Sequence, residues 1–306
     1  MLDCSVLTFW QLVLSEPDLM KNLSSKQLSF ILMVTAMCCL PGMDAMAKYL
    51  SQTMPVMQVI WFRYLGQFLV VLCILSSKLK ASAETDNLGT QLLRSGTLFG
   101  TTICFFFALE SIEQGQAAAT FQVAPLIISL LAMLFLGERL GVKKCLGILI
   151  GFTGAIIIVQ PQQFHFSTFA LLPILAATFY AIYAVLTRSL GENDDARTTL
   201  FYTTAFGAVA TCFVIPFVWV SPTTIAEILA IAVMVTLASV GHFLLIKAFQ
   251  LNGASDLAPL NYFGLVFALL WGAFLFGETP AVTTLIGSFL VVGAGLFVMK
   301  NREAYK

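Results

Sequence analysis

Charged residues are scarce in this sequence. Asp, Glu, Lys and Arg make up 10% of the 306 residues, whereas soluble domains contain about 25%. Hydrophobic residues make up 59%, and a chain of this composition is typical of an integral membrane protein. Sixteen Lys plus Arg balance sixteen Asp plus Glu, so the charge indicates no surface for nucleic acid, and the expected environment is the lipid bilayer.

Histidine and clustered cysteine are also lacking. The two histidines are His165 and His242, and the seven cysteines stand singly or as one adjacent pair, without CxxC or Cys/His spacing. We therefore expect no metal site, no redox centre and no cofactor. The sequence contains neither a Walker A motif nor an HExxH motif, which excludes the ATP hydrolysis and zinc-protease chemistry that these motifs provide.

Long apolar runs are what the sequence has instead. A helix needs about 20 apolar residues to span a bilayer, and clusters such as SSKLKASAETDNLG and RSLGENDDA separate the runs. We expect an all-α membrane protein with ten transmembrane helices, near residues 28–50, 56–78, 92–110, 116–136, 143–161, 167–188, 198–220, 225–249, 256–276 and 281–300. No gap between them is long enough for a soluble domain.

The positions of Lys and Arg give the expected orientation, because positive charges favour the cytoplasmic side of a membrane. Most of them fall on one side of the expected spans: Lys21, Lys26, Lys78, Lys80, Arg94, Arg139, Lys143, Lys144, Arg188, Arg197, Lys300, Arg302 and Lys306. We therefore predict that both termini face the cytoplasm. Residues 1–27 are expected to form an N-terminal extension, with Met1 and Met20 as alternative starts.

The second half of the chain repeats the first with a constant offset. The shift that moves residue 134 onto residue 274 aligns LFLGERLGVKKCLG (134–147) with FLFGETPAVTTLIG (274–287), so that two GE dipeptides coincide. A unit of five spans has an odd number of crossings, so the second copy enters the membrane from the opposite side. We expect two inverted repeats, residues 28–161 and 162–306, an arrangement that permits alternating access.

These features resemble the drug/metabolite transporter superfamily, specifically its EamA-type bacterial members. The resemblance covers residues 28–300 and depends on three features: the five-plus-five arrangement, the GE dipeptides after spans four and nine, and Arg63 in VIWFRYLGQ. The second half departs from the first, with Thr203 at the position of Arg63. We expect Glu138 and Glu278 of the GE dipeptides to be loop or cap residues. The resemblance implies a central cavity lined mostly by helices one, three, four, six, eight and nine.

The stretch PGMDAMAKYL places a Pro-Gly pair and two charges in the first expected span. Asp44 and Lys48 are four residues apart, so they face the same way on a helix and can pair. Pro41 leaves one helical carbonyl without its donor, and with Gly42 it permits a bend. Two interpretations stay open: a gating pair whose carboxylate carries a proton, or a structural pair in which Lys48 extends to the surface.

Other polar and aromatic residues at membrane depth are candidates for lining the cavity. Arg63 is expected to tie helix two to carbonyls of a neighbouring helix or to Asp44, and Pro125 to kink helix four. The remaining candidates are Gln116, Thr120, Gln122, Tyr180, Tyr183, His242, Asn261, Tyr262 and Trp271. The alternative for each is a packing or interface residue. Such a lining suits an amphipathic organic molecule better than a bare ion.

The pattern favours a secondary active transporter that moves a small organic metabolite across the bacterial inner membrane. An amino acid or a flavin is a candidate substrate, because MDAMAKYLSQTMPVMQVIWFRYLGQ is also similar to a subgroup that includes riboflavin transporters. The alternatives are an intramembrane enzyme and a passive channel, neither of which needs two interconverting halves. The sequence leaves open the substrate, the direction of transport, the oligomeric state and the coupling ion, for which a proton is one candidate.

Overall fold

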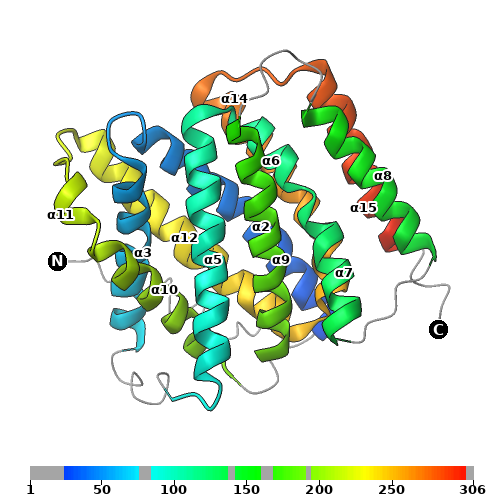
Figure 1. Ribbon diagram of the computed structural model, residues 1–306, viewed down its shortest axis with the longest axis horizontal. Coiled ribbons are helices and arrows are strands. Elements are labelled where there is room, and N and C mark those ends of the chain that lie inside the picture. The colour runs from blue at the N-terminus through cyan, green and yellow to red at the C-terminus, as the bar shows by residue number, and fades with distance from the viewer. Residues whose placement is uncertain (1–23, 76–83, 137–141, 160–167, 191–193, 301–306) are drawn as a thin grey trace.

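The computed structural model describes residues 24–75, 84–136, 142–159, 168–190 and 194–300, and this part of the chain is helical and contains no strand. Its elements are α2 (Ser25–Leu50), α3 (Val56–Leu75), α5 (Leu88–Ser111), α6 (Gln114–Phe121), α7 (Ala124–Leu136), α8 (Val142–Val159), η2 (Thr168–Leu171), α9 (Leu172–Leu190), α10 (Ala196–Cys212), α11 (Ile215–Val218), α12 (Ile225–Leu251), α13 (Ala254–Leu257), η3 (Ala258–Asn261), α14 (Tyr262–Phe276) and α15 (Val282–Lys300) (Figure 1). Among the described residues, six helical segments are long and apolar enough to cross a bilayer, and α14 and part of α15 are shorter apolar helices. The prediction of an all-α membrane protein is confirmed.

Local chemistry explains where several helices begin and end. At the start of α2, Ser24 and Gln27 form a capping box in which each side chain accepts a hydrogen bond from the other's backbone N–H. Thr224 and Glu227 form the same arrangement at the start of α12. Gly277 ends α14 with φ of 64°, a left-handed conformation that glycine adopts without steric strain.

Helix boundaries in the two halves of the chain are related by the same constant shift as the sequence repeat. α2 and α9 end at Leu50 and Leu190, and α3 and α10 begin at Val56 and Ala196. The ends of α5 and α12, the starts of α6 and α13, the ends of α7 and α14 and the starts of α8 and α15 have the same spacing. The ten spans therefore form two five-helix repeats, as predicted. The expected boundary between the repeats and most of the expected N-terminal extension lie outside the described residues and stay predictions.

The fourth and ninth spans are interrupted, although the sequence predicts a single helix for each. Two residues separate α6 from α7, just before Pro125. In the second repeat, α13 passes into the 3-10 turn η3, which contains Pro259, before α14 begins. Proline lacks a backbone N–H and disfavours helical geometry at the residue before it. The expected kink at Pro125 is therefore a break, and the second repeat has its own break about four residues earlier in the repeat.

The two repeats pack on each other along the whole molecule. α2 lies against α12 and α14, α5 lies against α9 and α10, and α8 lies against α15 at one edge of the bundle (Figure 1). The main apolar clusters accordingly combine residues from both halves, for example Met33 and Ala36 with Ala248 and Phe249. The centre of the protein is thus an interface between the repeats, where a change in their relative position alters every central contact.

Candidate functional site

The two helix breaks meet near the centre of the bundle. Gln122 follows the end of α6, Asn261 ends η3, and Gln122 Nε2 donates a hydrogen bond of 3.3 Å to the carbonyl of Asn261. Both residues line a cavity. Helices broken at corresponding positions of two repeats mark the binding site in many transporters, because the ends of the broken helices offer polar groups at membrane depth.

The cavity has a volume of about 110 Å³ and receives residues from both repeats. It is lined by Met37, Leu40, Pro41, Met43, Asp44, Arg63, Leu98, Thr101, Thr102, Phe105, Phe106, Gln114, Ala118, Phe121, Gln122, Tyr180, His242, Asn261, Gly264 and Ala268. These residues come from α2, α3, α5, α6, α9, α12, η3, α14 and the break after α6. Every helix that the family resemblance implies therefore contributes, and α3 contributes as well.

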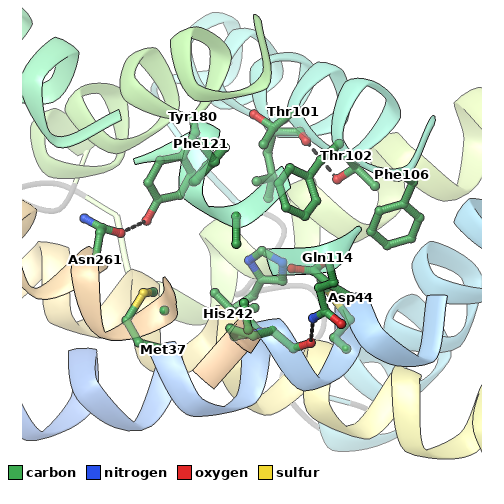
Figure 2. Close-up of a pocket in the computed structure, with 18 of the residues that line it drawn as sticks. Met37, Asp44, Thr101, Thr102, Phe106, Gln114, Phe121, Tyr180, His242 and Asn261 are labelled. Atoms are coloured by element: carbon green, nitrogen blue, oxygen red, sulfur yellow. Dashed lines mark hydrogen bonds between the residues drawn. The ribbon is translucent and has the colours of Figure 1, made fainter. Parts of the chain in front are cut away.

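Polar and aromatic groups are unevenly distributed around the cavity. Figure 2 shows Asp44 and Gln114 at one side and Tyr180 and Asn261 at the other, with His242 between them. The hydroxyl of Tyr180 donates a hydrogen bond of 2.9 Å to Asn261 Oδ1. Phe121 lies beside Tyr180 in this view and Phe106 lies on the side of Asp44, so the carboxylate and the Tyr180–Asn261 pair are on opposite sides of the cavity.

Arg63 is buried in the wall of the cavity and contacts three side chains. Its Nη1 donates to Thr102 Oγ1 at 2.6 Å, its Nε contacts Met43 Sδ at 3.2 Å, and its Nη2 lies 2.6 Å from His242 Nε2. Because a guanidinium has no acceptor, His242 Nε2 must accept, so the ring proton is on Nδ1 and the imidazole is neutral. The expected bonds from Arg63 to backbone carbonyls or to Asp44 are wrong for this structure, since its partners are other side chains.

Asp44 and Lys48 do not form the expected ion pair. Among the described residues, no group donates a hydrogen bond to the carboxylate of Asp44, although the charge of Arg63 lies close enough to act on it. Lys48 Nζ instead contacts Glu278 Oε1 at 2.5 Å and donates to the carbonyl of Ile112 at 3.1 Å. The i,i+4 spacing places both side chains on one face of α2, but the partner that satisfies Lys48 comes from the other repeat.

Glu278 is therefore more than the loop or cap residue that the sequence predicts. It follows Gly277, whose left-handed conformation turns the chain back at the end of α14. Besides Lys48, its carboxylate accepts a hydrogen bond of 3.1 Å from the backbone N–H of Gln114 at the start of α6. The repeated GE dipeptide was the one sequence feature that could have pointed to a special role for Glu278. Glu138, in the other GE dipeptide, lies outside the described residues.

The Pro-Gly pair does not interrupt α2. The helix is continuous through Pro41, whose carbonyl accepts a hydrogen bond of 2.8 Å from Gln114 Nε2. A Cβ at Gly42 would lie 3.0 Å from Leu237 Cδ1 and 3.1 Å from the ring of Trp271, so glycine here permits close packing against α12 and α14. The bend that the sequence allows at this pair stays a prediction, and Trp271 packs against α2 and does not line the cavity.

Several expected cavity residues lie elsewhere. Thr120 is buried and donates to the carbonyl of Gln116 within its own helix, and Gln116 lines a small hollow beside Glu278. Tyr262 packs against α8, where a Cβ at Gly151 would lie 3.1 Å from its hydroxyl. Among the expected cavity residues, the structure brings together Asp44, Gln122, Tyr180, His242 and Asn261, and the gating candidates Pro41 and Arg63 also line the cavity.

Tyr183 belongs to a second buried network outside the cavity. Its hydroxyl accepts a hydrogen bond of 3.1 Å from Arg94 Nη2, and Arg94 also donates to Thr187 and Thr203 at 2.7 and 2.6 Å. Arg94 is completely buried, whereas the sequence places it among the cytoplasmic charges, because α5 begins four residues earlier than expected. Thr203, the counterpart of Arg63, thus binds a different arginine.

Polar contacts also join the two repeats at the end of the bundle opposite Lys48. Asp194 Oδ2 accepts hydrogen bonds of 2.8 Å from Thr85 Oγ1 and Gln91 Nε2. Within the second repeat, Gln250 Nε2 donates to the backbone carbonyl of Asp194 at 2.9 Å, and the carbonyl of Gln250 accepts from Arg188 at 2.9 Å, which holds Asp194 in place. The central cavity therefore lies between two groups of polar contacts, one at each end.

Comparison with known proteins identifies relatives of the whole chain. The model of the EamA-like transporter family matches it twice, at residues 27–160 and 167–300, and the two matches are related by the same shift as the helix boundaries. A crystal structure aligns with 92% of this chain and 100% of its own chain at a TM-score of 0.74 and 18% identity. This structural likeness shows the fold alone.

Three similar proteins have transport functions. The pseudopaline exporter of Pseudomonas aeruginosa is 30% identical over an alignment of 283 residues, which covers 89% of this chain and 96% of the exporter. The S-adenosylmethionine uptake transporter of Rickettsia bellii is 27% identical over 85% of this chain and 89% of its own. The riboflavin transporter of Rhizobium johnstonii is 32% identical over 63% of this chain and 64% of its own.

Proposed function

Since the chain belongs to the EamA-like transporter family, it is a multi-pass membrane transporter and not an enzyme, and we propose that it works as a secondary active transporter by alternating access. The proposed substrate is a small organic metabolite that occupies the central cavity. The observation that carries this proposal is the meeting of two broken helices, one from each repeat, at a cavity lined by both repeats. Relative movement of the repeats would change access to this cavity from either side.

The contact between Lys48 and Glu278 is the proposed gate at one end. It joins α2 of the first repeat to the turn after α14 of the second, and the two side chains are only 15% and 13% exposed. Opening this end requires the two repeats to separate there, so the ion pair has to break. The hydrogen bonds from Thr85 and Gln91 to Asp194 would restrain the opposite end in the same way.

We assign the protein to the inner membrane of a bacterium, with both termini in the cytoplasm. The relatives named above are bacterial, and the excess of Lys and Arg on one side of the spans sets the orientation. In this orientation the Lys48–Glu278 gate faces the outside, and Asp194 lies at the cytoplasmic end.

The lining of the cavity supports an amphipathic or aromatic substrate. Phe105, Phe106, Phe121 and Tyr180 supply rings, and Asp44 supplies a carboxylate. Pseudopaline, S-adenosylmethionine and riboflavin, the compounds named for the relatives, are all organic molecules that combine polar groups with a carbon framework. The relatives include an exporter and an uptake transporter, so relatedness alone does not set the direction. Asp44 is also the proposed carrier if a proton drives transport.

Counterflow in proteoliposomes tests the proposal. Vesicles that contain the purified protein would be loaded with one unlabelled solute from a panel of amino acids, nucleobases, flavins and S-adenosylmethionine. We expect transient, saturable accumulation of the labelled solute for at least one compound. Uptake that rises linearly with concentration and shows no counterflow would instead indicate a channel and contradict alternating access.

A further inference from the structure

We propose that the cavity recognises an organic ammonium group, which binds at Asp44 while an apolar or aromatic part of the same molecule contacts the rings on the opposite side. This inference rests on the proposed function, because it names the substrate class of the same cavity. It follows from the balance of hydrogen-bond donors and acceptors that the protein leaves unused there.

The unused groups of the cavity are mostly acceptors. The carboxylate of Asp44 receives no hydrogen bond from the described residues. The Oε1 atoms of Gln114 and Gln122 are buried and likewise have no partner in this part of the chain. Buried polar atoms in native proteins are nearly always satisfied, so a ligand that donates several hydrogen bonds fits this set.

The orientation of both amide groups is fixed by their neighbours. Gln114 Nε2 lies 2.8 Å from the carbonyl of Pro41, and Gln122 Nε2 lies 3.3 Å from the carbonyl of Asn261. A carbonyl can only accept a hydrogen bond, so the NH₂ group of each amide must point to it. The oxygen of each glutamine is therefore the atom left for a ligand.

Thr101 adds to the excess of acceptors. Its hydroxyl donates to the carbonyl of Thr97 at 3.0 Å within α5, which leaves oxygen lone pairs and no proton for the cavity. The one buried donor without a partner among the described lining residues is Nδ1–H of His242. A carboxylate or phosphate would find few donors in this cavity, whereas an ammonium group carries up to three.

Arg63 does not reverse this preference. Its charge is opposite in sign to that of Asp44, but three of its five N–H groups already point to protein groups, namely Met43, Thr102 and His242, which leaves one N–H on each Nη atom. It therefore stabilises the partly buried carboxylate without occupying the carboxylate oxygens. Those oxygens stay available for a charge-assisted hydrogen bond, the stronger kind.

The rings complete the ligand class. Phe121 lies 5.4 Å from Phe105 and 5.3 Å from Tyr180, measured between ring centroids, in edge-to-face and tilted arrangements. All three residues line the cavity, and Figure 2 shows Phe121 and Tyr180 on the side away from Asp44. Such rings pack well against another aromatic or apolar group. A molecule with an ammonium group at one end and a ring at the other would contact both sides of the cavity.

A set of three indoles tests this inference on the purified protein in lipid nanodiscs. Tryptamine carries an ammonium group, tryptophol a neutral hydroxyl and indole-3-acetate a negative charge, all on the same ring. We expect tryptamine to bind about ten- to a hundredfold more tightly than the other two. Asp44→Asn should remove this difference, whereas Asp86→Asn, which makes the same change at an exposed residue, should preserve it.

The ranking of the three indoles by the unchanged protein needs no variant, so misfolding of Asp44→Asn cannot hide the answer. Failure of tryptamine to bind, equal binding of tryptophol or indole-3-acetate, or a preference for tryptamine that survives in folded Asp44→Asn would overturn the inference. Binding is measured without transport, so the two proposals fail separately. A wrong ranking with successful counterflow of another solute refutes the ammonium site alone, and the expected ranking without counterflow of any solute refutes the transporter mechanism alone.

Discussion

Thr102 and His242 occupy equivalent positions in the two repeats, and both contact the guanidinium of Arg63, each at 2.6 Å. Tyr180 has the same relationship to another equivalent pair, because its ring lies 5.3 Å from that of Phe121 and its hydroxyl bonds to Asn261. Arg63 and Tyr180 therefore each link the two repeats through a pair of equivalent positions. The residues in each pair differ in type, so the two-fold arrangement of the backbone encloses a chemically asymmetric cavity.

Replacement of His242 tests the contact with Arg63. His242→Leu leaves Arg63 Nη2 facing a buried apolar group, and we expect a loss of about 1–3 kcal/mol in stability. His242→Gln restores an acceptor and should retain most of that stability. Thermal unfolding in detergent measures both variants. Equal melting temperatures for the two would show that the hydrogen bond does not contribute.

Because Lys48 and Glu278 form one ion pair, we expect substitutions of the two residues to have non-additive effects on the rate of transport. Lys48→Ala and Glu278→Gln should each slow transport, because each removes the same contact, and the double variant should be no slower than the slower single one. The loss of stability should lie between the ~1 kcal/mol of a surface pair and the ~3–5 kcal/mol of a buried one, since the side chains are partly exposed. Lys26→Ala, at an exposed residue, is the control. A nearly silent Lys48→Ala would show that Lys48 only extends to the membrane surface.

Asp44→Asn separates energetic coupling from substrate binding. If Asp44 carries the coupling proton, the variant should lose transport against a gradient while it stays folded. Exchange of substrate without a gradient should survive if the carboxylate serves coupling alone, and should be lost too if Asp44 also binds an ammonium group. Both activities are measured in the same proteoliposomes. A normal rate of transport against a gradient would contradict both roles.

Tyr180 and Tyr183 are stacked neighbours on α9 with different predicted roles. Tyr183→Phe removes an acceptor for the buried Arg94 and should cost about 1–3 kcal/mol of stability without a change in KM. Tyr180→Phe removes the bond to Asn261 inside the cavity and should change the KM for substrate. Thermal unfolding and transport kinetics of the pair give the comparison. A raised KM in Tyr183→Phe with an unchanged one in Tyr180→Phe would place the site on the wrong tyrosine.

The proposed orientation can be tested with reporter fusions. A fusion at residue 86 or at the C-terminus should report the cytoplasm, and fusions at residues 113 and 163 should report the opposite side. The reason is the distribution of Lys and Arg. A C-terminus outside the cytoplasm would be incompatible with this distribution and with a cytoplasmic N-terminus before ten spans.

The repeat and most of the spans were predictable because apolar length and a constant offset are local or periodic properties of the sequence. The residues on cavity-lining helices were predictable in part: polar groups such as Asp44 and Asn261 stand out within apolar runs. The partner of Lys48 could not be identified, because Glu278 lies in the other repeat, far along the sequence, and its approach depends on how the repeats pack. Asp44 was expected to pair with Lys48 because it is the opposite charge nearest to Lys48 in the sequence.

Two further differences have physical causes of the same kind. Thr101 and Phe105 were missed because a threonine or phenylalanine in an apolar helix does not stand out, and only the packing of α5 turns these two toward the cavity. Arg94 was counted among the cytoplasmic charges because it lies only two residues inside the expected span 92–110. Its buried hydrogen bonds to Tyr183 and two threonines offset the loss of water and allow α5 to begin earlier.

Two halves with the same five-helix arrangement would, if their sequences and helix boundaries were also identical, give outward-facing and inward-facing states of equal free energy. Exchange of conformation between the halves would then leave the molecule unchanged. Thr203 at the position of Arg63, and His242 at that of Thr102, remove this equality. The same backbone exchange would therefore produce a different set of contacts, and their difference in free energy sets the side on which the empty protein rests.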